Sequence, residues 1–188
     1  MITSYSTLKP GATTAPPARL VFFIREGLLV GHAGIYFFRI NVVSGGGGGS
    51  LSNLTDPSVV NNPEKVSQRI TYKDTKNHSD VTAGNRGGPI PPGVYGIAIP
   101  TLSNTGKSFL SNLLPKEEST KLLLSKKRLN RDSFQIHRTG KYGSDGCIVS
   151  VNDKEHETLM ESLKLSKGGT LSVYLSQSET TSVTQSEN

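Results

Sequence analysis

The sequence predicts a β-rich α+β fold with one or two short helices. Short runs rich in Val, Ile and Phe are separated by turns that contain Gly and Pro, and only one segment combines a helical pattern with capping residues. Hydrophobic residues make up 34% of the 188 residues, glycine contributes 20 and tryptophan none, which is unlike a helical bundle. A chain of this length fits one domain with tails and buries a core without disulfides.

The first strands are expected to form an antiparallel meander. Residues 19–25 (RLVFFIR) precede Glu26-Gly27 and a second apolar run at 28–30, which predicts a β-hairpin. Residues 34–43 (GIYFFRINVV) continue as a third strand. Residues 1–17 are polar and rich in Ser, Thr and Pro, and they lack the basic and apolar parts of a signal peptide. We therefore expect them to form a flexible leader.

The middle of the chain mixes loops with further strands. Residues 44–50 form a Gly-rich loop or linker, natural or engineered, because consecutive glycines disfavour regular structure. Residues 51–86 are polar and predict a long surface excursion. A proline-rich turn at 87–93 fixes the direction of a strand at 94–99. A loop or short helix is expected at 103–114, followed by strands at 121–125 and 133–137.

The last part of the chain predicts a helix and a final strand. Asn152-Asp153 can cap a helix that runs to about residue 165, and Gly168-Gly169 can end it. Residues 171–175 alternate as a strand, and the polar residues 176–188 are expected to be a disordered tail. The predicted domain therefore spans residues 18–175. The apolar helix residues expected on one face are Leu159, Met160 and Leu163.

The chain is basic, with a net charge of +6 and a pI near 9.5. Residues 116–141 carry eight basic and three acidic side chains, a local excess of +5. Such a surface attracts polyanions, and on its own it is most simply a solvated basic face. Aromatic residues do not interleave with it and no nucleic-acid-binding motif is present, so we expect no nucleic-acid partner. The longest apolar runs, 20–24 and 34–38, are too short to span a bilayer.

The single cysteine excludes an intramolecular disulfide and a multi-cysteine zinc site. A histidine metal site is not indicated either, since the histidines show no ligand spacing. The four histidines are His32, His78, His137 and His156.

The candidate site is the stretch from Phe134 to Val149. His137 ends a predicted strand, and ten residues later Cys147 follows Gly146 on a tight turn. A thiol is mostly protonated at neutral pH, and a nearby imidazole can take its proton. Gly146 leaves room for substrate, and the N–H groups of Gly146 and Cys147 can form an oxyanion hole. Alone, the pair is a weak signal, because a single cysteine is more often a small buried hydrophobe.

Two sequence blocks in the same order resemble the L,D-transpeptidase (YkuD-type) superfamily. His137 followed by residues 144–148 (SDGCI) resembles its His…Ser-x-Gly-Cys-Ile signature, and residues 88–95 (GPIPPGVY) resemble a second shared block. With Arg131 shortly upstream of His137, they look most like the branch of type VI secretion effectors with an L,D-transpeptidase-like domain. The resemblance covers roughly residues 19–175 and implies a β-sandwich or open barrel.

The resemblance implies a peptidoglycan-targeting enzyme in which Cys147 expels the terminal D-alanine of a stem tetrapeptide. His137 would act as base and then as acid, and Ser144 would orient the imidazole or donate to the substrate. Water, a free D-amino acid or a second stem could resolve the thioester, giving L,D-carboxypeptidase, exchange or cross-linking activity. The resemblance implies that the reaction needs no metal or organic cofactor. Guanidinium groups suit a substrate carboxylate. The candidate substrate-binding residues are Arg131, Arg138, Tyr142 and Asp145.

The chain departs from housekeeping members of the superfamily near the cysteine. Asp145 stands where many have His, and Val149 and Ser150 stand where Arg or Asn is common. These departures fit an antibacterial effector toxin, made in the cytoplasm, secreted and acting in the periplasm of target bacteria. Such a toxin implies a cognate immunity protein and a delivery component of a secretion system.

Three alternative functions stay open at this point. Two are enzymes of related chemistry: a housekeeping cross-linking L,D-transpeptidase and a peptidoglycan cysteine peptidase. The third, from another class, is a basic module that binds a polymer or nucleic acid and in which Cys147 is incidental.

Overall fold

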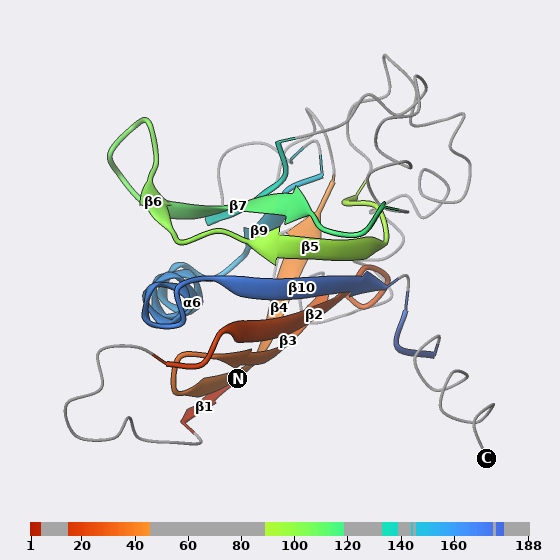
Figure 1. Ribbon diagram of the computed structural model, residues 1–188, viewed down its shortest axis with the longest axis horizontal. Helices are drawn as coiled ribbons and strands as arrows, with labels where there is room; N and C mark the ends of the chain where they lie inside the picture. Colours follow the sequence, from red (N-terminus) through yellow and green to blue (C-terminus); the bar gives the residue numbers. More distant parts are fainter. Residues whose placement is uncertain are drawn as a thin grey trace.

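Ten strands and one helix are described in the computed structural model, which covers residues 1–4, 15–45, 89–118, 133–138, 144, 146–174 and 176–178 (Figure 1). In chain order they are β1 (Ile2–Ser4), β2 (Ala18–Phe23), β3 (Leu28–Ala33), β4 (Tyr36–Ser44), β5 (Gly93–Ile97), β6 (Thr101–Leu102), β7 (Phe109–Pro115), β8 (Gln135–Arg138), β9 (Ile148–Ser150), α6 (Asp153–Leu165) and β10 (Gly169–Tyr174).

The predicted meander is present as β2, β3 and β4, which pair in antiparallel order. Gly27 and Gly34 occupy the two turns with φ of 57° and 59°, a conformation that glycine adopts without a Cβ penalty. Alternate side chains of β2 and β4 are buried, including Leu20, Phe22 and Ile40. The hydrophobic alternation of this region therefore fixes both the hairpins and the face that meets the core.

The pairings close the sheet on itself. β10 lies between β2, with which it is parallel, and β5, with which it is antiparallel. The order continues through β7, β8 and β9, and β9 pairs with β4. Eight of the described strands thus form a closed barrel, with β1 attached to β4 and β6 to β7. The β-rich prediction is confirmed, but the barrel is closed where an open barrel or a sandwich was expected.

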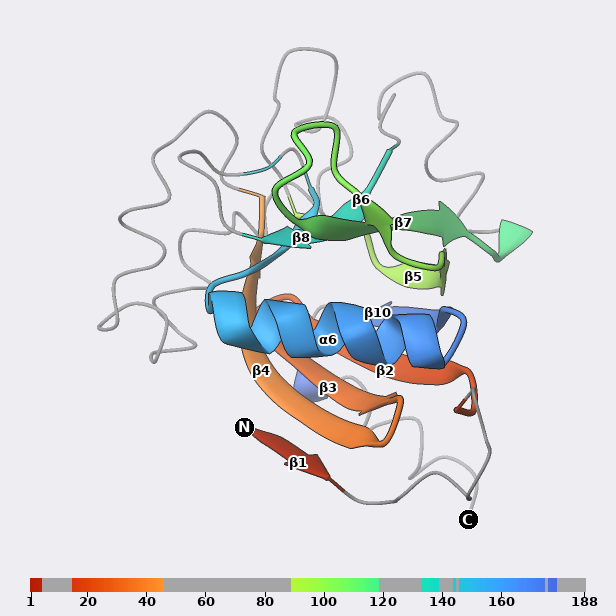
Figure 2. The same ribbon diagram turned by 90° about the vertical axis from the view of Figure 1, so that its left-hand side faces the viewer.

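The helix packs its apolar face against the barrel core. Figure 2 shows α6 between the strands β5, β7 and β8 on one side and β2, β3 and β4 on the other. Leu159, Met160 and Leu163 are buried, as the helical pattern predicted. Asn152 caps the helix by accepting a hydrogen bond from the Glu155 N–H (3.1 Å). At the other end, Gly168 takes φ 82° and its N–H bonds the Leu163 carbonyl.

Residues from both expected tails contact the barrel. Ile2–Ser4, at the start of the leader expected over 1–17, form β1 and pair with Tyr36 to Phe38 of β4. Ala15 is buried, and its N–H bonds the Leu165 carbonyl. In the expected tail 176–188, Ser176 is buried and the Gln177 N–H bonds the Glu26 carboxylate. These hydrogen bonds satisfy backbone N–H groups that lie outside the strands of the closed barrel.

The expectation of a loop or short helix at 103–114 is wrong. Residues 101–115 form the β6–β7 hairpin, which turns at Gly106 with φ 68°. The alternation of β7 is hidden in the sequence, because the inward residue Ser111 is polar while the apolar Leu114 is exposed. The strand expected at 121–125, most of the basic stretch and the surface excursion at 51–86 lie outside the described residues.

Candidate functional site

The turn that carries Cys147 is held by the end of β4. Ser144 N–H bonds the Gly45 carbonyl (2.9 Å), and the Ser144 hydroxyl accepts from the Gly45 N–H (3.4 Å) and donates to the Cys147 carbonyl (2.8 Å). Ser144 is buried at 7% exposure, and Cys147 is half-buried directly before β9. The hydroxyl predicted to orient the imidazole or donate to the substrate gives its proton to the Cys147 carbonyl. These hydrogen bonds link the cysteine turn to the residue that follows β4.

Gly146 takes a backbone conformation that the turn requires. Its φ is 112°, in a region that residues with a Cβ rarely adopt. The Gly146 carbonyl accepts a hydrogen bond from the Ser44 hydroxyl (3.0 Å), inside the barrel wall. The prediction that a glycine is needed before the cysteine therefore has a backbone reason as well as the expected steric one.

His137 lies on β8, half-buried, with one ring nitrogen engaged. Its Nδ1 is 2.7 Å from the Arg138 carbonyl oxygen. A carbonyl only accepts hydrogen bonds, so Nδ1 carries the proton in this pair. Nε2 is then the nitrogen whose lone pair can accept a proton in the neutral imidazole.

The parallel pairing of β8 and β9 brings His137 close to the cysteine turn. His137 is the partner of Val149, and side chains two residues apart on a strand share a face. Cys147 directly precedes β9, two residues before Val149. Strand alternation continued by one residue would set it diagonal to His137 on the same face, with the two Cα atoms about 8 Å apart. Ile136 and Ile148 face the core from the opposite side.

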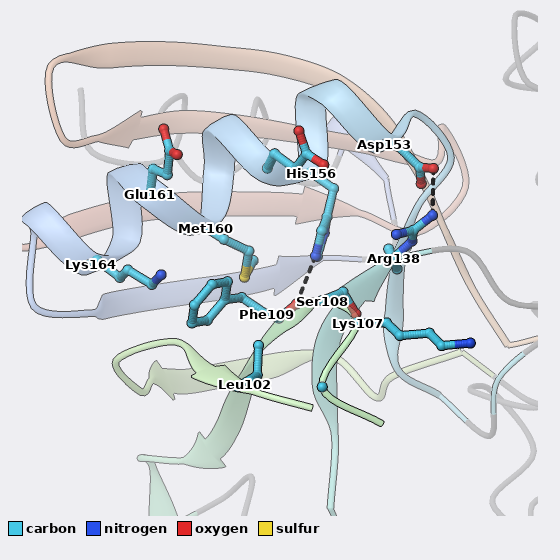
Figure 3. A pocket seen from close by; sticks show the side chains of 12 residues that line it. Leu102, Lys107, Ser108, Phe109, Arg138, Asp153, His156, Met160, Glu161 and Lys164 are labelled. Atoms are coloured by element: carbon cyan, nitrogen blue, oxygen red, sulfur yellow. Dashed lines mark hydrogen bonds and ion pairs between the residues drawn. The ribbon is translucent and has the colours of Figure 1, made fainter. Parts of the chain in front are cut away.

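Arg138 lies on the other face and does not join this pair. Its register partner is Ser150, whose hydroxyl lies 3.3 Å from Nδ1 of His156 on α6. The Arg138 guanidinium makes a 2.7 Å ion pair with Asp153 at the start of α6 (Figure 3). The candidate substrate-binding residue Arg138 therefore has an internal carboxylate partner on the helix side.

A cavity of about 370 Å³ lies between α6 and the β6–β7 hairpin, on the side of Arg138 (Figure 3). Its apolar lining includes Leu102, Phe109 and Met160, and the Lys164 ammonium sits 2.9 Å from the centre of the Phe109 ring. Its charges balance, so the lining does not favour a ligand of either sign. The charged lining residues are Lys107, Arg138, Lys164, Asp153, Glu157 and Glu161.

Three predicted site residues, Arg131, Tyr142 and Asp145, lie outside the described residues. One contributor to the site was missed. In the sequence Ser44 is only the start of the Gly-rich segment, yet its hydroxyl contacts the cysteine turn. No local signal marks Ser44, because the contact joins residues 102 positions apart.

His156 is a buried histidine that ties the helix to two strands. Its Nε2 donates to the Phe109 carbonyl (2.8 Å), and its Nδ1 accepts from the Ser150 hydroxyl. Burial lowers the pKa of His156 below its ordinary value, against the effect of the Phe109 carbonyl. The positive charges of His137 and Arg138 add to the lowering, and Asp153 opposes it. The folded protein therefore favours neutral His156.

This lowered pKa predicts that acid destabilises the fold. Above the unfolded-state pKa of about 6.5, His156 is neutral in both the folded and the unfolded protein. Below that pH the unfolded protein binds a proton at His156 more readily than the folded protein, because the folded-state pKa is lower. The free energy of unfolding should fall as pH drops from about 7 through the folded pKa, by at most about 1.4 kcal/mol per pH unit for this one proton.

Urea unfolding at several pH values checks this dependence. His156→Gln keeps a donor for the Phe109 carbonyl but cannot titrate, so it should flatten the slope. His32→Gln, at an exposed position on β3, is the matched control and should keep the wild-type slope. An unchanged slope in His156→Gln would contradict the prediction.

The described part of the chain shows neither a metal-binding cluster nor a membrane-spanning helix. No three His, Cys, Asp or Glu side chains there come together in a way that could hold a metal ion. No helix there has the length and apolar character to cross a bilayer.

Comparisons with known proteins give one structural likeness. No protein-family model matches the chain, and no curated protein matches it. Among solved structures, that of Bd1075 from Bdellovibrio bacteriovorus is similar, with a TM-score of 0.48 and 11% sequence identity. The match covers 91% of this chain and 54% of that one, so this chain spans about half the length of that structure.

Proposed function

We propose that this chain is a cysteine enzyme of the L,D-transpeptidase type that acts on peptidoglycan stem peptides. The observation that carries the proposal is the register of β8 and β9, which pairs His137 with Val149, two residues after Cys147. Two further features support it. The imidazole has Nε2 as its proton-accepting nitrogen, and the cysteine turn is fixed by hydrogen bonds from β4.

The proposed reaction begins with proton transfer from the Cys147 thiol to His137 Nε2. The thiolate attacks the carbonyl carbon of the diamino-acid residue, forming a C–S bond and an oxyanion. Collapse of the oxyanion breaks the C–N bond to the terminal D-alanine, and His137 returns its proton to the leaving amine. Water then attacks the thioester and releases a shortened stem and the thiol. A D-amino acid amine in place of water gives exchange.

The proposed biological role is that of an antibacterial effector acting in the periplasm of target cells. It is supported by the sequence around the cysteine, where Asp145, Val149 and Ser150 depart from housekeeping enzymes. We expect growth arrest when the protein is directed to the periplasm of a Gram-negative host and none when it stays in the cytoplasm. The Cys147→Ala variant should be harmless in both compartments, and a cognate immunity protein should relieve the arrest.

Mass spectrometry of purified muropeptides tests the proposed enzyme activity. Wild-type protein should convert tetrapeptide stems to tripeptide stems, and added D-amino acid should appear at the fourth position if exchange occurs. Cys147→Ala should form neither product, since no other group supplies the thioester.

Each other outcome indicates a different function. Loss of another bond, absent in Cys147→Ala, would identify a cysteine peptidase or amidase, and dimeric stems would identify a cross-linking enzyme. Identical product profiles for wild type and Cys147→Ala would end the thiol-enzyme proposal and favour a binding module. Polymer binding that weakens steeply with salt would support that module.

A further inference from the structure

Ser44 is a buried serine whose hydroxyl joins three segments that are distant in the sequence. It ends β4, has 0% exposure and is the register partner of Ile148. Its Oγ donates to the Gly146 carbonyl (3.0 Å) and accepts from the Ile90 N–H (2.9 Å). The proline-rich turn and the cysteine turn therefore meet on one hydroxyl.

The bond to Gly146 sets the orientation of the peptide group that leads into Cys147. In a planar trans peptide, the carbonyl and the following N–H point in opposite directions, and none of the described peptide bonds is cis. Holding the Gly146 carbonyl against Ser44 thus directs the Cys147 N–H away from Ser44. Because Gly146 has φ 112° and wide conformational freedom, the turn depends on such external bonds for its shape.

We propose that Ser44 is a positioning residue for the reaction at Cys147. It holds the Gly146–Cys147 peptide in the orientation needed to stabilise an oxyanion that forms beside the Cys147 sulfur. This inference rests on the proposed function in taking Cys147 as the nucleophile. The role passes through the backbone of Gly146, so its effect should appear only in reactions that form an oxyanion.

Two reactions of Cys147 separate positioning from general damage. Acylation by p-nitrophenyl acetate passes through a tetrahedral oxyanion, whereas alkylation by iodoacetamide does not. Ser44→Ala should slow acylation about 10- to 100-fold and leave alkylation within about threefold of wild type. The same variant should lower kcat on tetrapeptide stems by a similar factor with little change in KM. Cys147→Ala supplies the background rate in each assay.

Ser111→Ala is the matched control. Ser111, on β7, is equally buried at 0% exposure, and its hydroxyl donates to the Ala98 carbonyl rather than to the cysteine turn. Its acylation and alkylation rates should stay near wild type although it also loses a buried hydrogen bond. Ser44→Thr keeps the hydroxyl and should keep the wild-type ratio of acylation to alkylation. If Ser44→Ala does not fold, the ratio measured for Ser44→Thr tests the positioning role.

Equal slowing of both reactions in Ser44→Ala, no slowing of acylation, or an altered ratio in Ser44→Thr would overturn the positioning role. Because these assays need no stem peptide, they test the role of Ser44 even if wild type fails to cleave stems. Failure of the wild type to cleave stem peptides would count against the proposed substrate. It would not affect the result for Ser44.

Discussion

Replacing His137 with asparagine should lower kcat on stem peptides by about three orders of magnitude, within the range of about 10²–10⁴ that a general base contributes. His137 Nδ1 bonds the Arg138 carbonyl, and an asparagine amide nitrogen can take over this bond. The substitution therefore keeps the local contact and removes Nε2, the nitrogen that receives the thiol proton. Cys147 should also react more slowly with iodoacetamide at neutral pH, since less thiolate is present.

Three further variants make this expectation specific. His137→Ala removes both the contact and the base and should lose about as much activity as His137→Asn. Cys147→Ala combined with His137→Asn should be no worse than Cys147→Ala alone, because residues that act as a unit are not additive. Gln135→Ala, also on β8 but hydrogen-bonded outward to Asn112, should change kcat little. Substantial activity in His137→Asn would show that only the Nδ1 contact matters.

Local sequence signals predicted the elements whose pattern is complete within a few residues. The β2–β3–β4 meander follows from apolar alternation and the turns at Gly27 and Gly34, and α6 follows from the Asn152 cap. β7 was missed because its inward side chain Ser111 is polar and so resembles an outward position. The Ser111 hydroxyl can be buried because it donates a hydrogen bond to the Ala98 carbonyl. A buried polar residue of this kind interrupts the alternation of apolar and polar residues that predicts a strand.

Long-range pairing could not be predicted from the sequence. The parallel pairs β2–β10 and β8–β9, and the β4–β9 pair that closes the barrel, join segments with no shared local signal. The same limit applies to the candidate site. The motif singled out Cys147 and His137, but what brings His137 close to the cysteine turn is the β8–β9 register, which pairs it with Val149. Arg138 was predicted to bind a substrate carboxylate because a guanidinium suits one, and in the structure it pairs with Asp153 on the helix side.

Replacing Gly31 with alanine should have the largest effect on stability, about 4 kcal/mol or more, which is a large part of the roughly 5–15 kcal/mol that stabilises an ordinary domain. Gly31 lies inside β3 and pairs with both Leu20 and Phe38. Its φ is 133°, which L side chains rarely adopt, and an added Cβ would lie 2.1 Å from the Arg19 carbonyl oxygen. Both the backbone conformation and the close approach of β2 therefore demand glycine. We expect Gly31→Ala to accumulate as insoluble protein.

Two other glycines separate the effect of the positive φ from the effect of the close contact with the neighbouring strand. Gly106→Ala keeps φ positive at 68° but meets nothing within 4 Å, so it should cost only about 1–2 kcal/mol. Gly169→Ala meets the Ala18 carbonyl oxygen at 2.1 Å in the β2–β10 pair, without the positive φ of Gly31. The losses of stability should rank Gly106→Ala, then Gly169→Ala, then Gly31→Ala, measured by thermal unfolding for soluble variants and by the insoluble fraction for Gly31→Ala. Equal losses at Gly106 and Gly31 would mean that the strand contact at Gly31 adds nothing, and the tight β2–β3 approach would then not constrain the barrel.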